Sequence, residues 1–242
     1  MIREINSITD YILRCNLIPV GIGTTAVCFK LDNKSLKLYL NTLNKDHLFL
    51  SKHNIIDHLS NISKISNDTY LGPETILVKN NNCIGYTYEY VKGPTLSKVN
   101  NNITINSIFS NYKKLKDDTK RISNNNFYIV DLHDKNIIYS DGIKIIDLDR
   151  GYFQELGEPF EWNMLKINYI VLNSILNIKE NEIIKFKDNN FDDLYKLSIY
   201  KDYQKIYDLL EKLDSLNIIT KGDARKYKRK YSRSSYNTYY KY

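Results

Sequence analysis

Polar and apolar residues alternate in the first third of the chain, which is typical of short strands that are buried on one side. Val27-Cys28-Phe29-Lys30-Leu31 and Ser35-Leu36-Lys37-Leu38-Tyr39 read as two strands with a tight turn at Asp32-Asn33 between them. Another strand runs from Ile84 to Val91. Gly93-Pro94, just after this strand, interrupts the extended conformation and favours the start of a helix.

Elsewhere, apolar residues recur at helical spacing, which predicts helices over 1–19, 44–63 and 103–122. Two or three further helices complete the second half of the chain, beginning with the apolar run 163–176. The apolar face of the 44–63 helix is formed by Leu48, Ile55, Leu59 and Ile62.

Polar groups that suit a metal ion are concentrated in the segment from Asp131 to Asp149. NIIY and IKIID read as two strands of a hairpin, with turn residues at 140–142 between them. This hairpin would bring Asn136 and Asp147 side by side. A carboxylate and an amide oxygen suit a hard cation such as Mg²⁺, and Asp131 then stands where a catalytic base would.

Two readings of this segment stay open on the residues alone. The hairpin could be a chance pattern with a solvated acidic turn, because short motifs give false positives. Asp149 could be a second metal ligand or a turn residue, and the turn role is favoured because acids are common in turns.

A glycine-containing loop precedes the first strand pair. Small residues in such a loop let backbone N–H groups approach phosphates closely. The loop consists of Gly21, Ile22, Gly23, Thr24, Thr25 and Ala26.

Lys37 lies within an apolar strand. A buried ammonium is costly unless an anion faces it, so Lys37 requires a phosphate or a carboxylate. The alternative is that Lys37 points outward from an alternating edge strand.

Taken in order, these motifs resemble the protein kinase-like superfamily. The DLHDKN form at Asp131 is similar to aminoglycoside and choline phosphotransferases, RIO-type kinases and lipopolysaccharide kinases. The resemblance implies an α+β, two-lobed fold, with a small antiparallel N-lobe sheet over 1–91 and a shortened, mostly helical C-lobe over 92–220.

The resemblance also assigns roles to residues. ATP would lie against the 21–26 loop and Lys37, with adenine held by the backbone of Glu89 and Val91 behind a gatekeeper at Tyr88. Asn136 and Asp147 would hold Mg²⁺, and Asp131 would orient and deprotonate a hydroxyl acceptor, most simply a protein Ser, Thr or Tyr.

One departure from the family stands out. The helix after the lysine strand should carry a Glu that pairs with Lys37, yet no carboxylate falls on its apolar face. Glu74 is an outside candidate. A pseudokinase-like binding module is therefore the competing hypothesis, and a small-molecule phosphotransferase is a second alternative.

Composition adds a distinct tail. The net charge of +7 is carried entirely by 221–242, which interleaves basic residues with tyrosines and is expected to be flexible. This tail could be a solubilising segment or could bind nucleic acid, an acidic protein or an anionic membrane. Three unpaired cysteines favour a reducing cytoplasm, and no apolar run is long enough to span a membrane.

Overall fold

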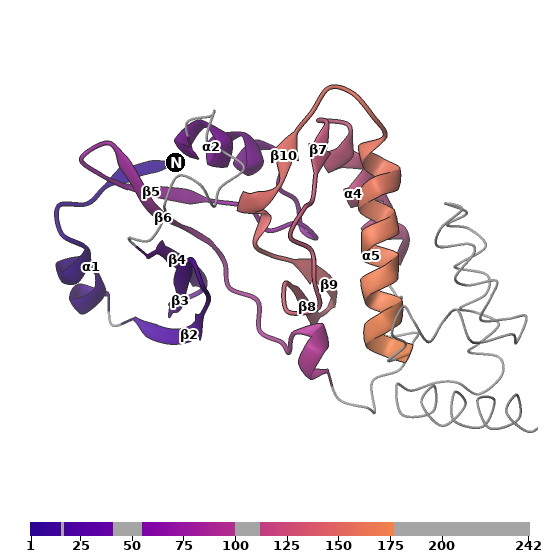
Figure 1. The fold of residues 1–242 in the computed structure, drawn as a ribbon. Coiled ribbons are helices and arrows are strands. Elements are labelled where there is room, and N and C mark those ends of the chain that lie inside the picture. Colours follow the sequence, from indigo (N-terminus) through magenta and orange to yellow (C-terminus); the bar gives the residue numbers. More distant parts are fainter. Residues whose placement is uncertain (16, 41–54, 100–111, 177–242) are drawn as a thin grey trace, which may run out of the picture.

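The computed structural model describes residues 1–15, 17–40, 55–99 and 112–176, which form two parts connected by the segment after Glu89 (Figure 1). The first part is built on a six-stranded sheet with the order β1-β5-β6-β4-β3-β2. Its strands are β1 (Ile2–Glu4), β2 (Ile18–Ile22), β3 (Ala26–Leu31), β4 (Lys34–Tyr39), β5 (Thr75–Lys79) and β6 (Asn82–Glu89).

The expected hairpin of β3 and β4 is confirmed. Leu31 pairs with Lys34 across a two-residue turn in which Asp32 has a φ of 53°, a conformation that Asp tolerates better than most residues. β6 then pairs with β4 and ends at Glu89, so the predicted 84–91 strand begins and ends about two residues earlier.

The expectation of a purely antiparallel sheet is wrong at one edge. β1 runs parallel to β5, with Ile2 opposite Ile76, and the next residue continues the ladder through the Ile5 N–H and the Val78 carbonyl at 2.9 Å. The strand has only three residues and no polar alternation, so its sequence resembles the start of the helix that follows.

Helices cover both faces of the sheet. α1 (Ile8–Arg14), capped by the Ser7 hydroxyl, packs Tyr11 and Ile12 against Leu36, Leu38 and Leu77. Of the described residues in the expected 1–19 helix, only these seven are helical, because β1 and β2 take the flanking segments.

α2 (Ile55–Ile65) covers the opposite face. Its Leu59 packs with Ile76, Val78 and Tyr86 of the sheet. The predicted apolar face is confirmed for Leu59 and Ile62, which are fully buried, whereas Leu48 and the first part of the predicted 44–63 helix lie outside the described residues.

The second part consists of helices and short strands. They are η1 (Leu96–Lys98), α4 (Tyr112–Ser123), β7 (Phe127–Tyr128), β8 (Ile137–Ser140), β9 (Gly142–Ile145), η2 (Leu148–Arg150), β10 (Tyr152–Phe153) and α5 (Pro159–Leu176). β8 pairs with β9, β7 pairs with β10, and α4 and α5 lie beside them (Figure 1). The predicted 163–176 helix is confirmed and begins four residues earlier, at Pro159.

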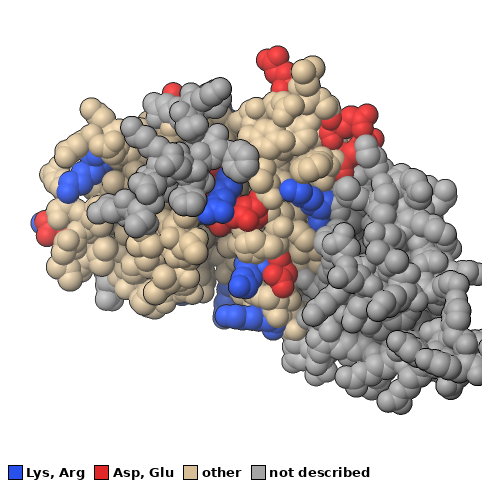
Figure 2. Space-filling model, in the orientation of Figure 1, with Lys and Arg blue, Asp and Glu red and all other residues tan. Residues whose placement is uncertain are grey.

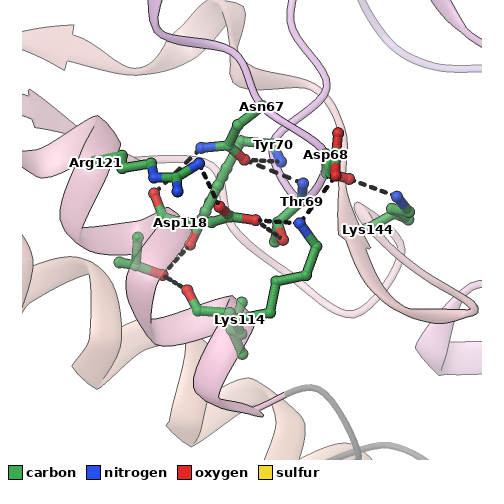
Figure 3. A network of polar contacts seen from close by, with 10 residues as sticks. Asn67, Asp68, Thr69, Tyr70, Lys114, Asp118, Arg121 and Lys144 are labelled. Atoms are coloured by element: carbon green, nitrogen blue, oxygen red, sulfur yellow. Dashed lines mark hydrogen bonds and ion pairs between the residues drawn. The ribbon is translucent and has the colours of Figure 1, made fainter.

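A polar network joins the two parts (Figure 3). The loop after α2 presents Thr69, whose hydroxyl donates to Asp118 of α4 at 2.6 Å, and Asp118 is almost fully buried. Lys114 bonds both Asp118 and Asp68, at 3.2 and 3.0 Å. The same loop bonds β9 through the Leu71 N–H and the Ile145 carbonyl at 2.9 Å. α2 and the sheet are therefore fixed against the second part.

The other predicted helices and the tail fall outside the described residues, which include only 112–122 of the helix expected over 103–122. The lobe and tail boundaries stay predictions. Within the parts of the chain that the structure describes, no helix is both long and apolar enough to cross a membrane.

Candidate functional site

The β8–β9 hairpin places Asn136 and Asp147 at the same end of one element. Ile137 pairs with Ile145, and the Ile146 N–H donates to the Asn136 carbonyl at 3.0 Å, so the two polar residues flank the open end of the ladder. Asp147 adopts a left-handed conformation, with φ 66° and ψ 44°. This conformation is uncommon for a residue other than glycine, and it turns the chain into η2.

Lys37 points into the protein, away from solvent. Its residue is only 5% exposed, and its ammonium bonds the carboxylates of Asp147 and Asp149. The inward orientation is thus the correct one of the two that the sequence allowed. Glu74 does not pair with Lys37, because it bonds Lys34 at 2.7 Å on the outside of the sheet.

Asp149 is the residue that the sequence reasoning undervalued. It lies in the η2 turn, as expected for a turn residue, but its side chain is buried and faces Lys37 Nζ at 2.9 and 3.0 Å. The Tyr39 hydroxyl donates to the same carboxylate at 2.8 Å. The available signal was charge balance, because Asp147-Leu148-Asp149 supplies two acids directly after the hairpin.

α2 reaches this centre through a histidine instead of an acid. Nε2 of His58 lies 3.1 Å from the backbone carbonyl oxygen of Asp149, within hydrogen-bond distance. Asp57, the acid on the described part of α2, is exposed, in agreement with the expectation that no carboxylate lies on the apolar face of this helix. Within the described residues, the carboxylates that contact Lys37 therefore come from Asp147 and Asp149 and not from α2.

The charges at this centre shift one another's pKa values. Burial alone would lower the pKa of Lys37, but the carboxylates of Asp149 and Asp147 raise it above its ordinary value. Burial would raise the pKa of Asp149, yet Lys37 and the Tyr39 hydroxyl bring it below its usual range. Burial, with the nearby Asp149 charge, raises the pKa of Asp147 despite Lys37. The Lys37–Asp149 pair is thus the firmly charged unit.

Asp131 lies on the loop before the hairpin and is about one-third exposed, at 31%. The Asn136 side-chain amide donates to the Asp131 backbone carbonyl at 2.9 Å, which ties the loop to the start of β8. Arg150 bonds the Asp131 carboxylate at 3.0 Å. Acidic and basic side chains lie next to one another between the two parts of the molecule (Figure 2).

The 21–26 loop joins β2 to β3. The Gly23 N–H donates to the Ala26 carbonyl at 2.8 Å, which closes the turn, and Ala26 itself is buried. Gly21 pairs with Cys28, and Cys28 with Lys37, so the three residues form one row across the sheet. Among the described residues, a Cβ added at Gly21 would meet nothing within 4 Å, so there is open space above this glycine.

The segment expected to bind adenine follows β6. The Tyr90 N–H donates to the Asn33 carbonyl at 3.0 Å, and Glu89 pairs with Lys34 across the sheet. Tyr88, at the expected gatekeeper position, is buried against Tyr86, with ring centroids 5.8 Å apart. The roles of Glu89 and Val91 stay predictions.

A divalent cation would have to be held with help from a ligand. Among the described residues, no three His, Cys, Asp or Glu side chains are grouped as a metal site of their own. Asp147, whose side chain is 29% exposed, and the Asn136 amide oxygen would be two hard oxygen ligands. This incomplete set fits Mg²⁺, which commonly takes its remaining ligands from water and substrate phosphates.

Comparison with solved structures shows a kinase-like fold. The chain is similar to the twitchin kinase region from C. elegans, with a TM-score of 0.52 and 14% identity over 68% of this chain and 35% of that chain. It is also similar to a C. elegans twitchin fragment described as an autoregulated protein kinase with immunoglobulin domains (TM-score 0.53, 13% identity, 75% of this chain and 48% of that one).

The chain thus spans less than half the length of these structures, and the low identity means that they show the fold alone. No protein-family model matches the sequence, and no curated protein matches it. What is established is a mixed α+β structure with a six-stranded sheet and helices that resembles solved chains containing a kinase.

Proposed function

We propose that the chain is an ATP- and Mg²⁺-dependent kinase that transfers the γ-phosphoryl group to a hydroxyl, most simply that of a protein Ser, Thr or Tyr. The carrying observation is the buried Lys37 ammonium in contact with Asp147 and Asp149. A lysine and two acids from distant parts of the sequence meet where the kinase-like fold would bind a nucleotide. Phosphoryl transfer depends chiefly on such positioned charges.

Lys37 and the 21–26 loop would orient the phosphates. The open space above Gly21 and the row from Gly21 to Lys37 support this role. Next to the loop, Ile18 and Val20 of β2 are more than half exposed, at 58% and 52%, although they are apolar. We infer that they cover the flat face of the base, while the Glu89 and Val91 backbone bonds its edge.

Asn136 and Asp147 would hold Mg²⁺, which neutralises phosphate charge when it is bound. Burial and the nearby Asp149 charge raise the pKa of Asp147, whose side chain is 29% exposed, and a bound cation would favour its charged form. Asp149 would keep Lys37 in place from the buried side. Lys37 would therefore keep Asp149 as a carboxylate partner while Asp147 binds Mg²⁺.

Asp131 would position the acceptor hydroxyl and take its proton. Its partial exposure leaves the carboxylate accessible, and the Asn136 amide fixes its backbone. The absence of a helix acid had favoured a binding module without activity. Asp149 answers that objection, because Lys37 does have buried acidic partners.

Labelled γ-phosphate transfer from ATP tests this function. Asp147→Ala should reduce transfer about 100-fold or more, because removing one transition-state charge partner costs on this scale. Asp141→Ala, at the exposed tip of the same hairpin, is the matched control and should keep its activity. Undiminished transfer by a folded Asp147→Ala protein would overturn the assignment.

A further inference from the structure

Three basic groups lie near Asp131, one on η2, one on α5 and one on its own loop. Arg150 of η2 lies 3.0 Å from Oδ2, and Nε2 of His133 lies 4.0 Å from Oδ1. Lys166 of α5 donates to the carbonyl of Val130, the residue before Asp131, at 3.0 Å. Of these contacts, the sequence motifs indicate only the proximity of His133, which lies two residues after Asp131.

Arg150 is held firmly and keeps hydrogen-bonding capacity. The next residue, Gly151, packs so closely on Phe127 that an added Cβ would lie 2.2 Å from a ring carbon. Its N–H also bonds the Leu148 carbonyl at 2.9 Å. The guanidinium has five N–H donors, and its side chain is 35% exposed, so donors remain for a second anion beside Asp131.

Lys166 is also fixed in place. Its ammonium bonds the Ile129 and Val130 carbonyls and lies 4.7 Å from the centroid of the Trp162 ring. Arg150 and Lys166 carry one positive charge more than Asp131 neutralises, and the Lys37 centre, with Asp147 and Asp149, carries one net negative charge that offsets it. On the loop itself, Asp134 is followed by Lys135, so these two residues do not change the balance.

A hydroxyl that approaches Asp131 therefore meets the partly exposed guanidinium of Arg150, which keeps donors for a second anion. We propose that the acceptor is an acidic protein segment, in which a hydroxyl residue is flanked by Asp, Glu or a residue that is already phosphorylated. The hydroxyl would meet Asp131 while the neighbouring anion bonds Arg150, as guanidinium groups do with carboxylates and phosphates. This proposal rests on the proposed kinase function, and it makes the basic 221–242 tail a poor acceptor.

Two serine peptides of equal length test the substrate class, one with flanking Glu and one with flanking Lys. The full-length chain should give at least about a tenfold higher kcat/KM for the Glu peptide, and the preference should weaken with added salt. Equal use of the peptides, or preference for the Lys peptide, overturns the acidic acceptor while leaving the kinase intact. No transfer to any acceptor, with no ATP turnover, overturns the kinase function itself.

The ratio of the two kcat/KM values is then compared among variants, because a general loss of activity cancels in the ratio. Arg150→Gln should reduce the preference about tenfold, whereas Arg150→Lys should keep most of it by retaining the charge. Arg14→Gln, on the exposed side of α1, is the control and should leave the ratio unchanged. A preference that is unaltered in folded Arg150→Gln would contradict the role given to Arg150.

Discussion

Nζ of Lys37 lies 2.9 Å from Oδ2 of Asp149, and both side chains are almost completely buried. The lysine comes from the sheet and the acid from the turn after the β8–β9 hairpin, so this pair ties together the two parts of the molecule. The pair also gives Lys37 a carboxylate partner, which α2 does not provide.

Lys37→Met should both abolish phosphoryl transfer and destabilise the protein. The buried carboxylate of Asp149 and the partly exposed one of Asp147 would lose their cation, which costs about 3 kcal/mol of unfolding free energy or more. Lys34→Met, on the same strand, removes a half-exposed pair with Glu74 and should cost less than about 1 kcal/mol. Denaturant unfolding of the two variants provides the comparison, and equal losses would show that the buried centre contributes no special stability.

Asp149→Asn and Asp147→Asn should change stability in opposite directions. Asp149→Asn removes the charge that Lys37 and Tyr39 bond, with a loss of about 2 kcal/mol. Asp147→Asn removes a carboxylate whose pKa is raised by burial and by Asp149, so the variant should be up to about 1 kcal/mol more stable at neutral pH. Thermal unfolding at pH 7 tests both, and a stability loss in Asp147→Asn would refute the account of this carboxylate.

The pH dependence of stability follows from the same shifts. The lowered pKa of Asp149 means that its contribution is complete above the ordinary value of 3.8 and is lost as the pH falls through the folded-state pKa. Lys37 acts at the other end: its contribution is complete below 10.5 and is lost as the pH rises through its raised folded-state pKa. Unfolding curves of Asp149→Asn should therefore lose part of the acid dependence, and curves identical in shape to those of the wild type would contradict this.

Gly21→Ala should separate binding from stability. No atom of the residues that the structure describes lies within 4 Å of the added methyl group, so the unfolding free energy should stay within about 0.5 kcal/mol of the wild type. The methyl group would occupy the space proposed for the phosphates, and the KM for ATP should rise about tenfold, equivalent to 1.4 kcal/mol. In Gly151→Ala, by contrast, the clash with Phe127 should lower stability directly. An unchanged KM in Gly21→Ala would remove the loop from the nucleotide site.

Asp118→Asn should weaken the connection between the two parts. The buried carboxylate accepts from Thr69 and Lys114, and charged hydrogen bonds of this kind contribute about 2 kcal/mol. Asp117→Asn, one residue earlier and exposed, is the control and should have little effect. Unfolding free energies compare the two substitutions, and similar values would show that the network is unimportant for stability.

The sequence alone predicted the β3–β4 and β8–β9 hairpins, because alternation and turn residues are local signals. Lys37 was expected to need an anion once it was buried, and the structure supplies one. The identity of that anion could not be predicted, since Lys37 and Asp149 are 112 residues apart and no local pattern records such a contact. The same limit applies to Arg150 and Lys166 around Asp131.

Two errors have local causes. β1 is too short to show alternation and continues into the apolar pattern of α1, so the two were read as one helix. Glu74 was an outside candidate for pairing with Lys37, but it lies on the outer side of the sheet, where it bonds Lys34. The position of Glu74 along the chain does not show which face of the sheet its side chain lies on, so it could not decide the partner of Lys37.

The affinity of the full-length chain for ATP, measured by calorimetric titration with and without Mg²⁺, tests the central claim most directly. Wild-type protein should bind ATP more tightly when Mg²⁺ is present, and Asp147→Asn should lose that gain while still binding ATP alone. Failure of the wild type to bind ATP, or an equal Mg²⁺ gain in Asp147→Asn, would contradict the account.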